Sequence, residues 1–258
     1  MLINASELKG YALMATDGRI GTVSDFLFDD TSWFVRWMVV DTGHWLKGRK
    51  VLLPPSVLDH VDRKEHEFAV SLTMKQVESS PDIDTEHTVS RQMETYIYDH
   101  YGWGPYWGTG LYMGGDGYMD TGMVASLSQA TKHREEDEKY ARERLDDPHL
   151  RSIAAISGYH IHACDGEIGH VEDFALDEAD WSIDYLIVDT RNWWPGKRVL
   201  LSPRTAQNIN WTDRLVNLSI SRQSVTDSPV FDPSTPTDPD HDKLFHYHYG
   251  NKELDHLP

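Results

Sequence analysis

The feature that most constrains the fold of this chain is an internal repeat. Residues 17–26 reappear with seven identities at residues 165–174, which lie 148 positions later. The same offset holds without a gap from residue pair 10/158 to residue pair 102/250, and 29 of these 93 pairs are identical. A register kept over this length indicates a duplication. The period exceeds the ~20–50 residues of solenoid repeats, so each copy is expected to be a domain with its own core or half of a shared one.

Each copy has the pattern of a small β-domain. The Asp-Gly dipeptides at 17–18 and 165–166 are typical of hairpin turns. After them the apolar residues do not alternate strictly, so a bulge or sharp bend is expected at Gly21 and Gly169. Thr73 and Ser221 are predicted to cap a short helical turn. Further strands are predicted over residues 34–40, 50–54, 67–72, 183–188, 198–202 and 215–220.

The repeat and the charge distribution divide the chain into four parts. A first domain is expected over residues 1–81 and a second over residues 155–229. A connector over residues 82–154 joins them, and an acidic tail containing His and Tyr follows over residues 230–258. Residues 96–118 of the connector are rich in Gly, Tyr and Trp, which fits either a flexible, adhesive linker or an aromatic lid. A charged surface helix is predicted over residues 128–145.

A longer pattern occurs in both copies, over residues 10–53 and 158–201. Gly-Tyr is followed by Asp-Gly-x-Ile-Gly-x-Val-x-Asp-Phe, then by a strand ending in Val-Asp-Thr and by a strand containing Val-Leu-Leu. This pattern resembles the PRC-barrel family, which is named for the cytoplasmic domain of the photosynthetic reaction-centre H subunit. The resemblance implies an all-β fold of two small SH3-like PRC β-barrels, with minor helix in the connector. We further expect the two barrels to pack face to face against each other in pseudo-two-fold symmetry, as a fused homodimer would.

The same resemblance implies a function. In the H subunit, and in a ribosome-maturation factor that carries this barrel, the domain docks other proteins and is not a catalytic site. We therefore expect a bacterial, non-catalytic protein-interaction or scaffold protein, related to the reaction-centre H subunit of photosynthetic electron transport. The sequence shows neither the membrane helix of the H subunit nor a pattern of quinone or pigment ligands. The protein partner and the oligomeric state are left open, with a homo-oligomer as one alternative.

The composition narrows the classes of partner and compartment. The formal net charge is −18 and no run of Lys and Arg exceeds two residues, so nucleic-acid binding is not expected. Residues 1–5 lack the features of a signal peptide, and the longest uncharged run, residues 100–115, is too polar to span a membrane. Cys164 is the single cysteine, which suits a reducing compartment. A soluble cytoplasmic protein without membrane insertion or cofactor is expected.

Acidic residues that recur in both copies are the candidates for chemistry. Asp25 with Asp173, and Asp41 with Asp189, are repeated pairs, and carboxylates can act as general acids or bases. Each lies along or at the end of a predicted strand, where a carboxylate also accepts backbone N–H bonds, and this structural role is favoured. No His or Cys recurs beside them. The chain is therefore expected not to be an enzyme.

Histidines and aromatic residues give an alternative function, a small-ligand or metal-binding protein. His160 and His162 alternate along a predicted strand, and His241, His246 and His248 lie close together in the tail. Imidazole suits zinc, copper and nickel. No cysteine or rigid spacing supports a specific site, so the metal ligands stay undetermined.

The candidate interaction surface is aromatic. Trp45 and Trp193 recur shortly after the Asp-Thr strand end, in a loop that returns at Gly48 and Gly196. An indole there either plugs the end of the barrel or stands exposed in an anchor patch, since Trp and Tyr dominate interface hot spots. The predicted surface consists of Trp45, Trp193, Trp194, Tyr101, Trp103, Tyr106 and Trp107.

Overall fold

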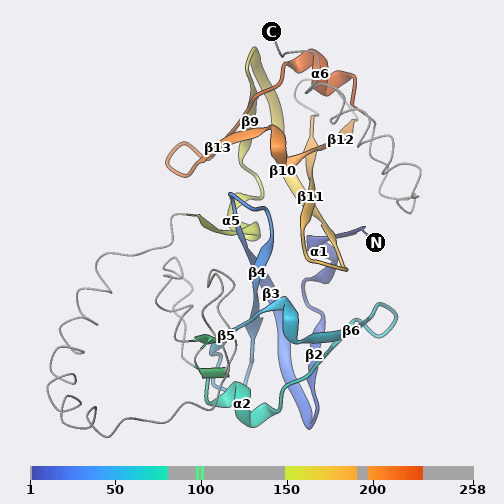
Figure 1. The fold of residues 1–258 in the computed structure, drawn as a ribbon, viewed down its shortest axis with the longest axis vertical. Coiled ribbons are helices and arrows are strands. Elements are labelled where there is room, and N and C mark those ends of the chain that lie inside the picture. Colours follow the sequence, from blue (N-terminus) through green and yellow to red (C-terminus); the bar gives the residue numbers. More distant parts are fainter. Residues whose placement is uncertain (1, 81–96, 99, 102–148, 191–196, 229–258) are drawn as a thin grey trace, which may run out of the picture.

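The computed structural model describes residues 2–80, 97–98, 100–101, 149–190 and 197–228. These residues form two seven-stranded sheets with short helical turns, so the all-β fold of two similar domains is confirmed. Figure 1 shows the first copy in the lower half of the molecule and the second copy in the upper half. Within the described part of the chain, no helix is long and apolar enough to cross a membrane.

The first sheet has the strand order β5-β4-β3-β2-β7-β6, with β8 paired to β3 beside this path. The pair β2–β7 is parallel and the others are antiparallel. The strands predicted over residues 34–40, 50–54 and 67–72 are confirmed as β4, β5 and β7, whereas β6 has no counterpart among the predicted strands. The elements are β2 (Ala12–Ala15), β3 (Gly18–Asp29), β4 (Val35–Asp41), β5 (Lys50–Leu53), η1 (Pro55–Val57), β6 (Leu58–Asp62), β7 (Glu67–Val70) and α2 (Met74–Glu78).

The second sheet repeats this topology as β12-β11-β10-β9-β14-β13, with β1 paired to β10. The helical turns capped by Thr73 and Ser221 are confirmed as α2 and α6, because each side chain accepts a hydrogen bond from the backbone N–H three residues later. The elements are β9 (His160–Ala163), β10 (Gly166–Asp177), β11 (Ile183–Asp189), β12 (Arg198–Leu201), η2 (Pro203–Thr205), β13 (Ala206–Asn210), β14 (Leu215–Leu218) and α6 (Arg222–Thr226).

The bend expected at Gly21 and Gly169 is present. The pairing of β2 with β3 shifts register beside Gly21, and the pairing of β9 with β10 shifts register beside Gly169. A Cβ atom on Gly21 would lie 2.1 Å from the carbonyl oxygen of Asp41, and one on Gly169 would lie 2.0 Å from that of Asp189. Only glycine allows this close approach of two backbones.

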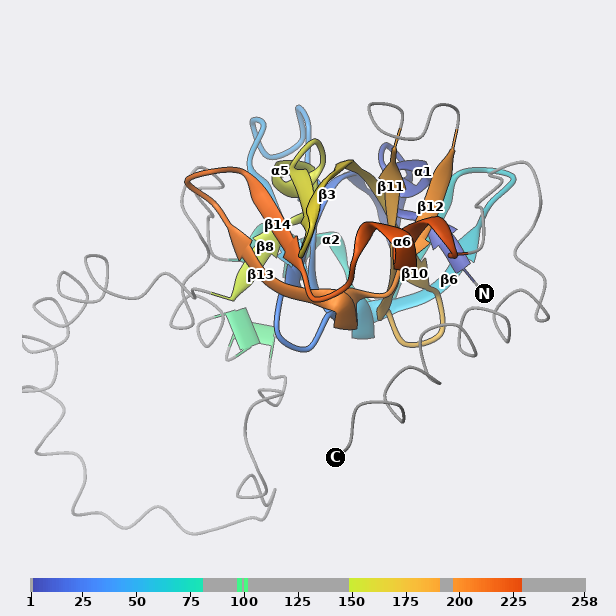
Figure 2. The same ribbon diagram turned by 90° about the horizontal axis from the view of Figure 1, so that it is seen from above.

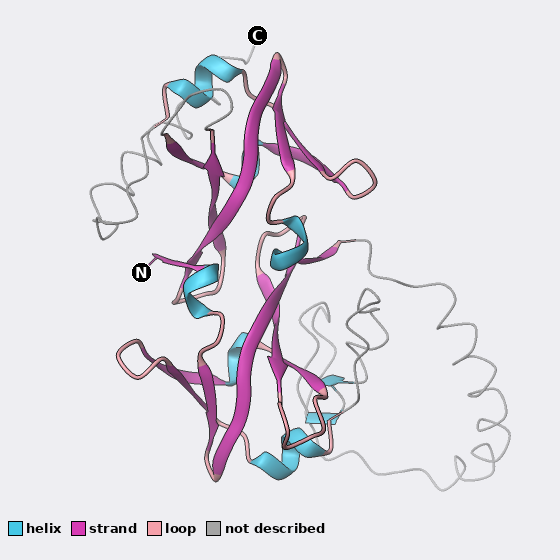
Figure 3. Ribbon diagram, turned by 180° about the vertical axis from the view of Figure 1, so that it is seen from behind, coloured by secondary structure: helices cyan, strands magenta, loops and turns pink. Residues whose placement is uncertain are grey.

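The two copies exchange their first segments. β1 (Leu2–Asn4) pairs with β10 of the second sheet, and β8 (Leu150–Ser152), 148 positions later, pairs with β3 of the first sheet. The helices that follow, α1 (Ala5–Leu8) and α5 (Ile153–Ile156), pack on the opposite copy in the same way. Figure 3 shows both segments at the centre of the molecule. The structural repeat therefore starts at residues 2 and 150, and β8 lies within the range 82–154 expected for the connector.

A carboxylate fixes each exchanged helix to the other copy. Asp173 accepts hydrogen bonds from the backbone N–H of Ser6 at 3.2 and 3.3 Å, and from its Oγ at 2.5 Å. Asp25 accepts hydrogen bonds from the backbone N–H of Ala154 at 3.0 Å and from the Oγ of Ser152 at 2.5 Å. Both aspartates thus accept hydrogen bonds from backbone N–H groups, which is the structural role favoured in the sequence analysis. The segment that they bind belongs to the opposite copy.

The β3–β4 and β10–β11 turns also form hydrogen bonds between the two copies. Trp33 and Trp181 have φ values of 58° and 62°, in the left-handed region that bulky residues rarely adopt. In this conformation the Trp33 carbonyl accepts a hydrogen bond from the Ile183 N–H at 2.7 Å. The Trp181 carbonyl accepts one from the Val35 N–H at 2.9 Å. Each contact has its counterpart 148 residues away, so the two copies are related by pseudo-two-fold symmetry.

One hydrophobic core runs through both copies. Phe28 of β3 packs against Phe174 of β10 with ring centroids 5.6 Å apart, and Phe26 lies 6.0 Å from Trp181. Buried apolar side chains of both copies belong to this same cluster, called the shared core below. Figure 2, which looks down the long axis, shows the second copy in front of the first along that axis. The copies are therefore halves of one packed unit.

The described connector residues lie on the first sheet. Ile97 and Tyr98 are buried against Trp37, Val39 and Leu52, which β4 and β5 direct away from the shared core. The start of the aromatic segment therefore covers the sheet, as the lid alternative expects. The helix predicted over residues 128–145 lies outside the described residues.

The exchanged segments should depend on their aspartates. Replacing Asp173 or Asp25 by Ala leaves backbone N–H and hydroxyl donors of the opposite copy without acceptors, which should lower the free energy of unfolding by about 1–3 kcal/mol each. Chemical denaturation measures the change. The control is Asp59→Ala, an exposed residue, which should change stability by less than about 0.5 kcal/mol. Equal effects at all three positions would contradict the anchoring role.

Candidate interaction groove

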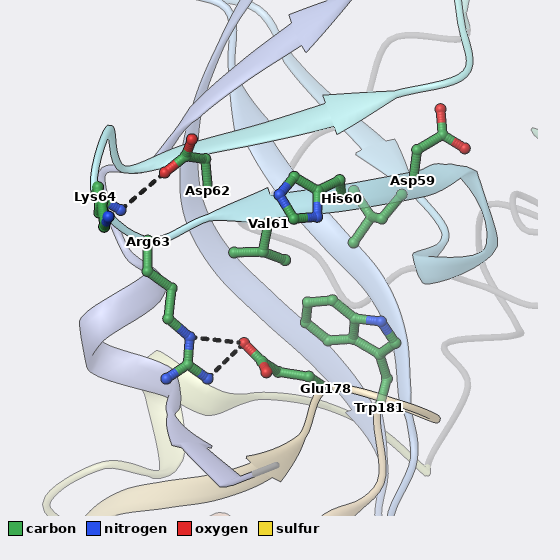
Figure 4. A pocket seen from close by; sticks show the side chains of 9 residues that line it. Asp59, His60, Val61, Asp62, Arg63, Lys64, Glu178 and Trp181 are labelled. Carbon is green, nitrogen blue, oxygen red and sulfur yellow. Dashed lines mark hydrogen bonds and ion pairs between the residues drawn. The ribbon is translucent and has the colours of Figure 1, made fainter.

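A groove lies where the two copies meet. Its volume is about 600 Å³. One wall is β6 and the turn that follows it, and the opposite wall is the β10–β11 turn of the second copy (Figure 4). The lining consists of residues 58–64 together with Glu178 and Trp181.

The wall contributed by the first copy is the edge of its sheet. β6 ends the strand order and, within the described residues, pairs with β7 alone. The register shifts at Asp59, which has no partner residue in β7. An edge strand presents N–H and C=O groups that can pair with another extended chain. The groove therefore follows a strand edge that is open to strand addition.

The opposite wall is a fixed indole. Trp181 is 8% exposed and packs against Phe26 and Phe68 of the first copy, with ring centroids 6.0 and 6.1 Å apart. Its backbone carbonyl is held by the Val35 N–H, as described above. The wall thus comes from the second copy but is positioned by the first. The groove consequently depends on the contact between the copies.

An ion pair closes one end of the groove. Arg63 Nη2 lies 2.6 Å from Glu178 Oε1, and Arg63 Nε donates a hydrogen bond to the same oxygen at 3.1 Å. The two side chains are 37% and 21% exposed, so water screens the attraction and the pair contributes about 0–1 kcal/mol. Its main effect is geometric, because it ties the β6–β7 turn to the opposite copy.

Charged groups line the rim. The carboxylate of Asp62 accepts hydrogen bonds from the backbone N–H groups of Lys64 at 2.9 Å and Glu65 at 3.1 Å. Both bonds lower the pKa of Asp62 below its ordinary value, and the bond from Glu65 has the larger effect. Asp59 and His60 are exposed beside them. The rim therefore combines acidic and basic side chains next to the strand edge.

The equivalent position in the second copy has different chemistry. Trp211 replaces Arg63, and the guanidinium carbon of Arg151 lies 4.7 Å from the centroid of the Trp211 ring. Arg151 Nε also contacts Asp30 Oδ2 at 2.5 Å, and Asp30 occupies the position equivalent to Glu178. The charged side chains of residues 59–64 thus have uncharged counterparts in residues 207–212 of the second copy, and β13 offers a matched control.

The predicted aromatic surface is only partly described. Trp45 is half-buried and packs against the shared core, and Tyr101 is half-buried between that core and the outer face of the first sheet. Burial raises the pKa of the Tyr101 phenol. A hydrogen bond with Ser80 and the charge of Arg49 lower this pKa by smaller amounts. Neither residue lines the groove. The other predicted residues lie outside the described residues: Trp193, Trp194, Trp103, Tyr106 and Trp107.

The histidines do not form a described metal site. His160 Nδ1 lies 3.2 Å from Glu167 Oε1, and both side chains are largely exposed. Among the residues that the structure describes, no group of three His, Cys, Asp or Glu side chains is placed to hold a metal ion. His241, His246 and His248 fall outside those residues.

The groove residues had little signal in the sequence. Residues 58–64 form a mostly polar stretch, and none of them is identical to its counterpart in residues 206–212. Trp181 recurs as Trp33, which is the one feature of the groove that the repeat marks. Sequence patterns therefore indicated the scaffold but not the edge strand and the charged rim.

The comparisons with known proteins agree with the fold of the first copy. Residues 1–73 match the family model described as the PRC-barrel domain. That match covers the first copy only, and the likeness of the second copy rests on the repeat and on its equivalent strand order. A search of curated proteins found no match.

The stability that the Asp62 carboxylate gives to the turn after β6 should depend on pH. The pKa of Asp62, measured by NMR titration of its carboxyl group, should lie below the ordinary 3.8. A lowered pKa means that the contribution of the carboxylate to stability is complete above the ordinary pKa and is lost as pH falls through the folded-state pKa. The stability difference between the wild type and Asp62→Asn should therefore be constant near neutral pH and shrink in acid. An Asp62 that titrates above 3.8 would contradict the bonds described.

Proposed function

We propose that this chain is a non-catalytic protein-interaction or scaffold protein that binds an extended segment of a partner protein along β6. The observation that carries the proposal is the groove, in which the edge of one sheet faces a fixed indole of the opposite copy. The match of residues 1–73 to the PRC-barrel domain supports a barrel used for docking.

An extended peptide suits this groove because each part of the lining offers a contact that a peptide makes. Backbone groups on the edge of β6 can pair with a partner strand. Trp181 offers an apolar wall for a side chain on the facing side of that strand. Asp59, His60 and Lys64 offer charges of both signs for residues that follow. Main-chain pairing then gives affinity, and the side-chain contacts give selectivity.

The duplication explains why such a site uses two copies. A single edge strand leaves a peptide exposed on one side. The second copy places Glu178 and Trp181 opposite β6, and the Arg63–Glu178 pair sets the end of the groove. A scaffold built from two interlocked copies also holds the two walls at a fixed separation, because the copies share one core.

The test places a proline in the edge strand β6 at its register shift. Asp59 has no partner in β7, and the preceding Leu58 is extended (φ −81°, ψ 121°), which proline at position 59 requires. Asp59→Pro removes the backbone N–H of the residue at the register shift, and the proline ring disfavours pairing of another strand along β6. Affinity capture with the full-length chain identifies the partner, and calorimetry measures its Kd. Asp59→Pro should weaken binding by at least about tenfold, equal to about 1.4 kcal/mol.

The matched control is Gln207→Pro in the second copy. Gln207 is the repeat equivalent of Asp59, lies at the same register shift in β13, and follows an extended Ala206 (φ −75°, ψ 122°). It should leave the Kd unchanged, and both variants should keep the melting temperature. A captured protein that binds both variants equally would rule out the β6 edge. Capture of no protein by the wild type, or substrate turnover abolished by one Asp or His substitution, would contradict the scaffold function itself.

A further inference from the structure

The outer face of the first sheet is covered by the chain itself. Trp37 and Leu52 point away from the shared core, and Ile97 and Tyr98 are buried on them. The ring centroids of Trp37 and Tyr98 lie 5.2 Å apart in an edge-to-face arrangement. In Figure 1 these connector residues are the short green pieces beside β5. This cover leaves β4 buried on both faces.

The second sheet has an equivalent outer face. Tyr185, Ile187 and Leu200 stand 148 positions after the three outward-facing residues of the first sheet, and they cluster with Ala175 and Leu2. They are 5%, 2% and 1% exposed. Their neighbours along β11 and β12 belong to the shared core, so both faces of these strands are buried. The second face therefore needs a cover of the same kind as the first.

The repeat extends through the covering segment. Residues 97–101 read Ile-Tyr-Asp-His-Tyr and residues 245–249 read Phe-His-Tyr-His-Tyr, and Gly follows both. Ile97 follows Glu78, the last residue of α2, by the same 19 positions that separate Phe245 from Thr226, the last residue of α6. Residues 245–249 lie outside the described residues, but their distance along the chain from the second sheet is that of the first cover from the first sheet.

Side-chain sizes are complementary between the face and the segment. On the second face, Ala175 replaces Leu27 and Tyr185 replaces Trp37, so the face has lost volume relative to the first. In the segment, Phe245 replaces Ile97 and Tyr247 replaces Asp99, which both add volume, whereas His246 replaces Tyr98, which removes some. Protein interiors are packed to nearly constant density, so a loss on one surface must be matched by a gain on the surface that meets it.

The polar groups at the edge of the cover agree with this pairing. His100 Nε2 lies 3.3 Å from the Oγ of Ser79, next to the end of α2. At the equivalent positions the second copy has His248 and Asp227. A carboxylate is a stronger partner for an imidazole N–H than a hydroxyl group is. The contact that the first copy makes can therefore be made more strongly in the second.

We propose that residues 245–249 are the occupant of the outer face of the second sheet, with Phe245 against Tyr185 and Leu200. The C-terminal tail is then an intramolecular ligand of the second copy. While it is bound, the apolar face formed by Tyr185, Ile187 and Leu200 is closed to other proteins and to a second copy of the chain. This contact is separate from the groove along β6.

Thiol labelling tests the proposal in the full-length chain. Cys164→Ser first removes the exposed native thiol. In that background Leu200→Cys reports on the outer face, and Leu201→Cys reports on the shared core one residue away. The readout is the ratio of the two maleimide labelling rates. Adding Phe245→Asp should raise this ratio at least about tenfold, because the cover opens locally while the core stays closed.

Two controls make the result specific. Phe231→Asp places the same charge elsewhere in the tail and should leave the ratio unchanged. Ile97→Asp with Leu52→Cys and Leu53→Cys calibrates the effect on the first sheet, where the cover is described. A change in ratio below about twofold with Phe245→Asp would overturn the proposal. So would an equal rise with Phe231→Asp, or equal rises at Leu200→Cys and Leu201→Cys, since these indicate general unfolding.

Discussion

The exchange of β1–α1 and β8–α5 between the copies is the contact on which the rest of the structure depends. Each exchanged helix has only four residues, which is too short to be stable alone, so it holds its shape only on the opposite copy. Asp173 and Asp25 bind its backbone, and its apolar residues enter the shared core. The carboxylate of Asp173 is buried inside this contact, and burial raises its pKa despite the opposing hydrogen bonds from Ser6 and Phe174. The groove exists because this exchange places a turn of the second copy opposite β6.

The two copies have kept their symmetry where they pack and lost it where they face solvent. The aspartate anchors and the left-handed Trp33 and Trp181 recur on both sides of the pseudo-two-fold axis. At the outer positions, Arg63 has become Trp211. A duplicated unit of this kind can change one surface without disturbing the core, because the contacts that recur in both copies are made in the interior. The difference between the two surfaces is the reason to place the binding site on the first copy.

Much of the fold could be predicted from the sequence, because the signals were local. Apolar runs predicted the central strands, and Gly21 and Gly169 predicted the bends. Thr73 predicted the start of a helix. The exchange could not be predicted, since β1 and β8 have three residues each and only Leu2 and Leu150 are identical across the exchanged segments. The groove was missed because β6, with two Asp and one His among its five residues, has no apolar run that would predict a strand. Its second wall depends on a contact between residues more than a hundred positions apart, which no local pattern reveals.

Differential scanning calorimetry of the full-length chain tests most directly whether the exchange makes the two copies one unit. The account predicts a single unfolding transition whose calorimetric and van't Hoff enthalpies agree, as for an all-or-none process. Two resolved transitions, or a calorimetric enthalpy about twice the van't Hoff value, would show that the copies unfold independently and would contradict the account.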